Sequence, residues 1–167
     1  MDVSDADLRK LIRLVAAAEG CRLAEVDLAL VGGGEMAGHN RRFLRHAGQT
    51  DVLSFDLSEA SRPGLSLQLI VCTDMAAKQG PLRGLTAGHE LMLYIVHGLL
   101  HQMGYEDSTV RGRARMHARE DYLLDLFGPG PAFYVPAKTS PKKPAKAPPK
   151  SAPKVAAKNP PAKRKPK

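Results

Sequence analysis

The sequence contains little of the material on which secreted, disulfide-stabilised or membrane-spanning proteins depend. Its 167 residues include two cysteines, no tryptophan and only 5% aromatic residues. The cysteines, Cys21 and Cys72, have no paired spacing, so we expect reduced thiols rather than a disulfide framework. No apolar run approaches the roughly 18 residues of a transmembrane helix, which predicts no membrane contact. The acidic start of the chain lacks the basic and apolar blocks of a signal peptide, so we expect a cytoplasmic protein.

The positive charge is concentrated at the end of the chain. The formal net charge is +8, yet residues 138–167 hold eleven of the 25 Lys and Arg residues and no acid. Nine of the 13 prolines also lie in residues 136–167, a composition that buries too little apolar area to offset its ordering entropy. We therefore predict a folded domain over residues 1–130 and a disordered Lys/Pro/Ala-rich tail over residues 131–167. Such a tail favours contact with polyanions such as RNA; the alternative is a solubilising extension.

Apolar periodicity predicts alternating helices and strands before the tail. The order favours an α/β or α+β sheet covered on one face by helices. Alternation at the start of the segment 65–72 is typical of an edge or half-exposed strand that forms a hairpin with the preceding strand. The predicted helices begin or lie within 4–19, 35–45, 74–79, 86–103 and 110–127, and the strands lie within 26–31, 50–57 and 65–72.

Two histidines four residues apart suggest a metal site. His97 and His101 lie on one face of the predicted helix, because residues i and i+4 stack along a helix. Gly104 is typical of the residue that ends a helix, and the turn behind it returns an acidic pair, ending in Asp107, toward the histidines. A catalytic zinc needs three such ligands and an open position for water. The alternative is a pair of incidental histidines.

Two blocks of sequence resemble the YbeY family of zinc-dependent bacterial endoribonucleases. Residues 97–107 read H-G-L-L-H-Q-M-G-Y-E-D and are similar to the family signature H-G-x-L-H-x-x-G-Y-D-H. Residues 40–55 end in T-D-V-L-S-F and are similar to N-x-x-[YF] followed by the same six letters. On the next helix, Met116 and Glu120 match a methionine and an acid of the family. The resemblance covers roughly residues 25–127 and implies an α+β fold: a small mixed sheet of about four strands, about five helices and a metal site on a central helix.

The resemblance also implies a ligand set. One Zn²⁺ per chain is expected on His97, His101 and Asp107, where Asp107 stands at the position of the family's third histidine. An aspartate oxygen is a competent zinc ligand, although its charge should make the metal a weaker Lewis acid. His117, a full turn into the next helix, is a less favoured third ligand. Glu90 either orients His97 or, as we favour, is a surface acid near a helix N-terminus.

A cation is expected at the phosphate. Family members carry an arginine directly after the aromatic residue of the first block, and Leu44 stands there in this chain. Arg42 and Arg45 flank it, and we expect one of them to act in catalysis, because an arginine fork matches the charge that develops on phosphate oxygens. The alternative for each is a solvated basic face.

The leading hypothesis is a single-strand-specific metal-dependent endoribonuclease in rRNA maturation and ribosome quality control, with RNA and the ribosome as partners. A zinc-dependent amide hydrolase is the second hypothesis. Metalloproteases of that kind carry a glutamate directly after the first histidine, and Gly98 stands there. The third hypothesis is a non-catalytic ribosome- or RNA-binding protein, which the departures at Asp107 and Leu44 keep open.

Overall fold

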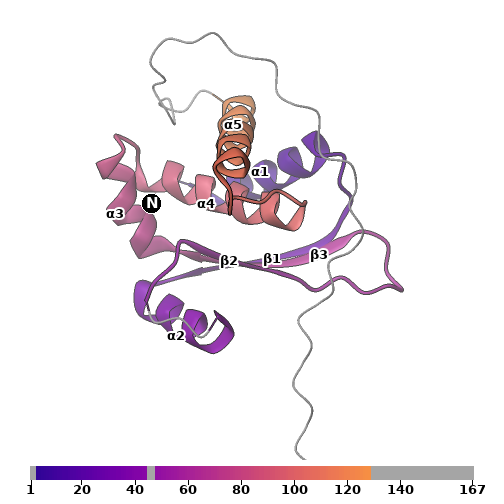
Figure 1. The fold of residues 1–167 in the computed structure, drawn as a ribbon, viewed down its shortest axis with the longest axis horizontal. Helices are drawn as coiled ribbons and strands as arrows, with labels where there is room; N and C mark the ends of the chain where they lie inside the picture. The colour runs from indigo at the N-terminus through magenta and orange to yellow at the C-terminus, as the bar shows by residue number, and fades with distance from the viewer. Residues whose placement is uncertain (1–2, 45–47, 129–167) are drawn as a thin grey trace, which may run out of the picture.

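The computed structural model describes residues 3–44 and 48–128, and these form an α+β fold (Figure 1). The order of helices and strands confirms the order predicted from the sequence. The sheet has three strands in the described residues, one fewer than the expected number of about four. The predicted tail, residues 131–167, lies outside the described residues. The elements are α1 (Asp5–Ala18), β1 (Leu23–Val31), α2 (Gly33–Leu44), β2 (Val52–Asp56), β3 (Leu65–Cys72), α3 (Thr73–Leu82), α4 (Ala87–Gln102) and α5 (Val110–Phe127).

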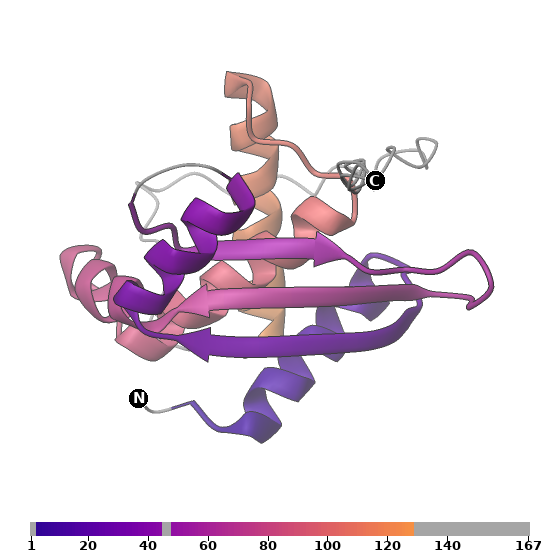
Figure 2. The same ribbon diagram turned by 90° about the horizontal axis from the view of Figure 1, so that it is seen from below.

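The sheet is mixed and has the order β1-β3-β2. Strand β3 runs parallel to β1 and antiparallel to β2, which confirms the predicted hairpin. Of the two alternatives predicted for β3, an edge strand is wrong, because β3 lies at the centre, while a half-exposed strand fits its partly exposed start. Its polar residues, Ser66 and Gln68, face the side of the sheet on which only α2 packs, and α2 covers the other end of that face (Figure 2). The alternation of polar and apolar residues at the start of β3 therefore reflects a part of the sheet face that no helix covers, and not a sheet edge.

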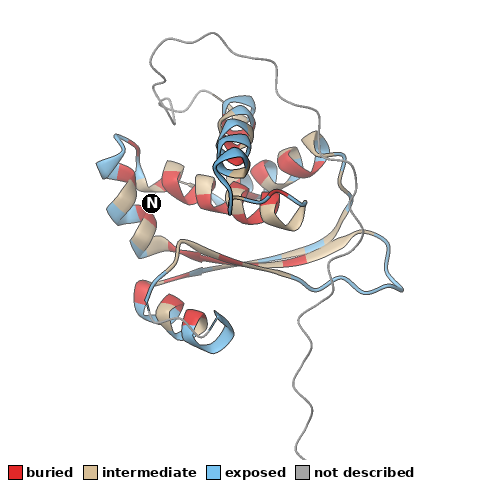
Figure 3. Cartoon of the chain, viewed as in Figure 1, coloured by how far each residue is buried: buried red, intermediate tan, exposed pale blue. Residues whose placement is uncertain are grey.

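Helix α4 is the centre of the larger core. It lies across one face of the sheet with α1 and α5, while α2 packs on the opposite face over a smaller core (Figures 1 and 3). A helix that is apolar all round must be buried all round. Ten of its 16 residues are buried: Gly88, Glu90, Leu91, Met92, Tyr94, Ile95, Val96, Gly98, Leu99 and Leu100. Within the described ranges, no helix is both long and apolar enough to cross a membrane.

Gly98 allows α4 to approach the sheet closely. A Cβ atom at this position would lie 2.9 Å from Val52 Cγ2 and 3.1 Å from Leu69 Cδ2. Both neighbours are packed side chains of the sheet, so a larger residue would push the helix away from β2 and β3. The close contact also fixes how far His97, the preceding residue in the chain, stands from the sheet.

We predict that Gly98→Val lowers the free energy of unfolding by about 1–3 kcal/mol, because overpacking a closed interface displaces its neighbours. Urea denaturation measures the change. The matched control is Gly38→Ala on α2, an exposed position where a Cβ meets nothing within 4 Å. That control should leave stability unchanged or raise it by about 0.5–1 kcal/mol through helix propensity. Equal stabilities of the two variants would contradict the packing argument.

Candidate metal centre and the cleft beside it

The structure brings together the three residues expected to bind metal. His97 and His101 sit on one face of α4 with their Nε2 atoms 3.0 Å apart and their rings nearly perpendicular, at 88°. The carboxylate of Asp107, in the turn after α4, lies 4.0 Å from His97 Nε2 through Oδ2 and 3.9 Å from His101 Nε2 through Oδ1. One ligand atom from each of the three residues lies within 4.8 Å of the others.

The hydrogen bonds of the two rings orient their free nitrogens. His97 Nδ1 lies 2.6 Å from Glu120 Oε1, and His101 Nδ1 lies 3.1 Å from the carbonyl oxygen of Tyr105. A carboxylate and a carbonyl can only accept, so each Nδ1 carries the proton and each Nε2 of a neutral ring presents a lone pair. Two lone pairs 3.0 Å apart repel each other unless a cation lies between them. Two such nitrogens and a carboxylate fit a divalent metal.

The end of α4 aims both His101 and Asp107. Gly104 has φ +92°, which confirms it as the residue that ends the helix. Its N–H donates to His101 O at 3.2 Å, and Tyr105 N–H donates to Leu100 O at 3.0 Å. This pair of bonds is a Schellman motif, in which the chain reverses at a left-handed residue. The reversal places the Tyr105 carbonyl against His101 and brings Asp107 in front of both rings.

Glu120 is the partner that sequence reasoning did not assign. It comes from α5, is 3% exposed, and accepts from His97 Nδ1 through Oε1 and from His117 Nδ1 through Oε2 at 2.9 Å. His117 is thus held by Glu120 and is not part of the three-residue cluster. A signal was present, because Met116, Glu120, Leu123 and Leu124 form the buried face of α5. An acid on an apolar helix face requires a buried partner.

The surroundings of His97 change its protonation. Burial by itself lowers the pKa of His97, but the hydrogen bond and charge of Glu120, with the charges of Asp51 and Asp107, outweigh burial and raise the pKa above its usual value. Without a metal, the charged pair stabilises the fold below the usual histidine pKa, and this contribution is lost as pH rises through the raised pKa. A metal ion that binds to His97 Nε2 must displace the proton of the charged ring, so the affinity of the site for metal falls as pH is lowered.

A cleft of about 400 Å³ opens beside His97. It lies between the segment before β2 and helices α3, α4 and α5. Polar and charged side chains line it, among them Asp51, Arg83, His97, His117 and Glu120. The candidate metal centre therefore borders a space that can admit a ligand.

Glu90 is buried in this region, so its reading as a surface acid was wrong. Its side chain is fully buried, and Oε1 accepts from Arg83 Nη1 at 2.8 Å. Within the described residues, Oε2 has no hydrogen-bond partner. Burial, followed by the charge of Glu90, raises the pKa of Tyr94, so its hydroxyl stays neutral. The reason for the error is tertiary: α3 packs against α4, and Arg83 at the C-terminal end of α3 pairs with Glu90.

Of the two arginines predicted for catalysis, the structure describes Arg42, and it does not lie at the histidines. Arg42 is exposed on α2, with its guanidinium carbon 5.5 Å from the ring centroid of Phe43. Helix α2 packs on the face of the sheet opposite α4 (Figure 1), and Arg42 does not line the cleft. Arg45 lies outside the described residues. A catalytic role for either arginine stays a prediction.

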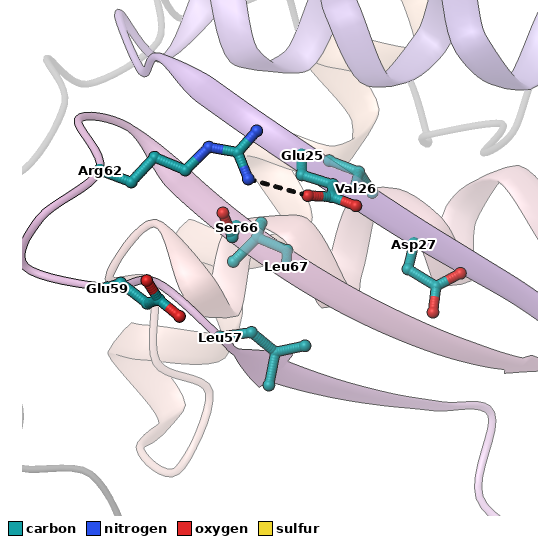
Figure 4. Close-up of a pocket in the computed structure, with 8 residues that line it drawn as sticks. All are labelled: Glu25, Val26, Asp27, Leu57, Glu59, Arg62, Ser66 and Leu67. Carbon is teal, nitrogen blue, oxygen red and sulfur yellow. Dashed lines mark hydrogen bonds and ion pairs between the residues drawn. The ribbon is translucent and has the colours of Figure 1, made fainter.

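A second cleft, of about 440 Å³, lies where the sheet meets the β2–β3 connection (Figure 4). Arg62 of that connection reaches across to Glu25 of β1, with Nη1 and Oε2 3.1 Å apart. The cleft also contains Asp27 and Glu59 but no histidine. Without a histidine, this cleft lacks the imidazole nitrogen donors of the candidate metal centre. Its ion pair is exposed and its acids face solvent.

Fold and site together define an α+β domain whose candidate metal centre stands at the end of a buried helix, beside a cleft. The chain belongs to the Endoribonuclease YbeY family, whose model matches residues 2–128. This confirms the resemblance seen in the two sequence blocks.

Individual relatives agree with the family. Endoribonuclease YbeY of Mycobacterium tuberculosis is 34% identical over 136 residues, which cover 75% of this chain and 77% of that protein. The relative of the same name in Salinibacter ruber is 34% identical over 132 residues and covers 75% and 84%. The solution structure of a Thermotoga maritima protein has a TM-score of 0.53 at 24% identity, covers 74% of this chain and 79% of that chain, and supports the fold alone.

Proposed function

We propose that this chain is a single-strand-specific endoribonuclease whose divalent ion binds to His97, His101 and Asp107. Family membership makes it a metal-dependent endoribonuclease with a role in rRNA processing. Strand specificity, the choice of Zn²⁺, ribosome quality control, contact with the ribosome and a cytoplasmic location are parts of the proposal. The observation that carries the metal assignment is the convergence of two Nε2 lone pairs, 3.0 Å apart, in front of a carboxylate.

The residues around the centre divide the work between them. A bound ion would polarise a phosphodiester oxygen or activate a water. Glu120 holds the Nδ1 proton of His97 and fixes the ring, and the Tyr105 carbonyl does the same for His101. Such partners orient metal ligands and raise their basicity. Arg42 or Arg45 is the candidate for charge stabilisation at the phosphate, and the basic tail is the candidate for first contact with RNA.

The choice of zinc rests on the donor set. Two neutral imidazoles and one carboxylate suit Zn²⁺ better than Mg²⁺ or Ca²⁺, which prefer oxygen ligands. Three protein ligands leave a fourth position for water or substrate, as a catalytic site requires. Asp107 adds negative charge, so we expect its bound water to have a higher pKa than in a three-histidine site.

The amide-hydrolase alternative is weakened by the packing of Gly98. Metalloproteases use a glutamate at that position as general base. Here the position faces Val52 and Leu69 of the sheet at 2.9 and 3.1 Å from a Cβ atom, so no side chain can extend from it. A non-catalytic RNA-binding protein remains the third reading, and a cleavage assay separates it from the enzyme.

Removing His101 tests the proposal. Purified full-length protein should cleave single-stranded RNA, lose cleavage in chelator and regain it with Zn²⁺. His101→Ala should reduce cleavage to background, because one nitrogen ligand is lost. The matched control is His89→Ala on the same helix, outside the three-residue cluster, which should retain activity. Equal cleavage by wild type and His101→Ala would assign the activity to a contaminant.

Replacing Asp107 tests the third ligand. We predict that Asp107→Ala lowers Zn²⁺ affinity by at least roughly 10–100-fold, which is the loss typical of replacing a residue that only supports a metal ligand. Asp107→His should retain binding, because an imidazole is also a zinc ligand. Competition with a chromogenic chelator measures both. If Asp107→Ala binds Zn²⁺ as tightly as wild type, another group is the third ligand.

Replacing Glu120 tests the support of His97. Glu120→Gln should lower Zn²⁺ affinity about 10–100-fold, because the amide is a weaker acceptor for the Nδ1 proton. The control is Asp125→Asn, an exposed acid on the same helix, which should have no effect. Isothermal titration measures the affinity. A Glu120→Gln affinity equal to that of the control would exclude a positioning role.

A further inference from the structure

The cleft beside His97 contains a cation that the proposed reaction has not used. Among the described residues that line it, Arg83 is the one with a permanent positive charge. Its backbone is fixed at the end of α3, where its N–H donates to Gly80 O at 3.0 Å and Gln79 O at 3.3 Å. A guanidinium whose backbone is fixed at the wall of a cleft is suited to bind an anion.

The buried acid beneath it holds the guanidinium in place. Arg83 Nη1 donates to Glu90 Oε1 at 2.8 Å, and Glu90 is completely buried while the Arg83 side chain is 53% exposed. The guanidinium is thus the nearer charge to the cleft and the carboxylate the more distant one. A guanidinium has five donors, and in the described part of the chain the side chain of Arg83 makes this one hydrogen bond. Donors remain for a ligand.

The two acids that line the cleft make their hydrogen bonds to groups other than Arg83. Glu120 accepts from two histidines. Asp51 accepts through Oδ1 from Val52 N–H at 2.8 Å and from the Thr50 hydroxyl at 3.0 Å. Neither acid is paired with Arg83, so the guanidinium is not neutralised from the cleft side. An anion entering the cleft meets Arg83 as its partner.

The spacing along α4 indicates which anion. Glu90 precedes His97 by seven residues, which is roughly 10 Å along a helix axis. Arg83 and His97 line the same cleft, and a guanidinium anchored on Glu90 lies further along that cleft than a phosphate that sits at the histidines. It is placed instead for a neighbouring phosphate of the same strand, which an arginine fork binds through two parallel hydrogen bonds.

We infer that Arg83, anchored by Glu90, binds a second backbone phosphate of the RNA strand, adjacent to the one at the histidines. This inference rests on the proposed function, because it takes RNA as the ligand. The contact reads no base, so it should act equally on every sequence. It also requires a substrate longer than the single phosphodiester at the reaction centre.

The experiment compares two full-length double variants of equal net charge, Arg83→Gln/Glu90→Gln and Arg62→Gln/Glu25→Gln, each of which removes one ion pair. Removing Glu90 together with Arg83 avoids a buried unpaired carboxylate, which would destabilise the fold. The Arg62–Glu25 pair is exposed and lies outside the cleft beside His97, so this control leaves Arg83 on its anchor. Binding of a single-stranded oligoribonucleotide is measured by fluorescence anisotropy in chelator at several salt concentrations. The Arg83 variant should bind about tenfold more weakly, because a charge-assisted contact is lost.

The salt dependence separates a phosphate contact from a general loss of structure. Losing one phosphate contact should reduce the slope of log affinity against log salt by about 0.7 for a single strand. Arg83→Lys keeps the charge and should keep the wild-type slope while losing the bidentate geometry. Equal affinities and slopes for the two double variants would overturn the inference, as would a loss confined to one base sequence.

A cleavage assay in the presence of Zn²⁺ distinguishes a failure of the proposed reaction from a failure of the proposed phosphate contact. If wild type cleaves RNA, the Arg83 variant should show a raised KM with an unchanged kcat, because the contact lies away from the reacting bond. If wild type does not cleave but the Arg83 variant still binds RNA more weakly, the proposed reaction fails and the phosphate contact stands. If wild type cleaves and the double variants bind alike, the reaction stands and the contact fails.

Discussion

The site depends on two hydrogen bonds to ring nitrogens. Glu120 and the Tyr105 carbonyl each accept a hydrogen bond from the Nδ1–H of one histidine, and the opposite nitrogens of His97 and His101 thereby face each other. Neither acceptor belongs to α4 itself, since one comes from α5 and the other follows the helix end. The donor set of the candidate metal centre therefore exists only when three segments of the chain are packed together.

Burial of α4 makes this arrangement rigid and also costly. The helix is covered by α1, α3, α5 and the sheet, and Gly98 allows β2 and β3 to contact its backbone side closely. Every polar group placed on such a helix must find a partner inside the protein. Glu90 finds Arg83, and His97 finds Glu120. The groups that satisfy these needs are the same groups that shape the cleft.

The third residue of the candidate centre is an aspartate, at the position where the sequence resemblance implies a histidine. The turn after Gly104 brings the carboxylate of Asp107 within 4.0 Å of both Nε2 atoms. An aspartate in this position adds a negative charge to the site. The cleft alongside offers one permanent cation among the described residues, Arg83, on a helix that the family signatures do not include.

The sequence alone determined the local features, and tertiary packing decided the rest. The order of elements, the hairpin and the helix end at Gly104 follow from patterns of neighbouring residues, so they could be predicted. The pairing of His97 with Asp107 could be predicted because one short turn joins them. The central place of β3, the burial of Glu90 and the bond from Glu120 depend on residues far apart in sequence, and no local pattern encodes which surfaces will cover them. For the same reason, sequence patterns pointed to Arg42 and Arg45, while packing placed Arg83 in the cleft.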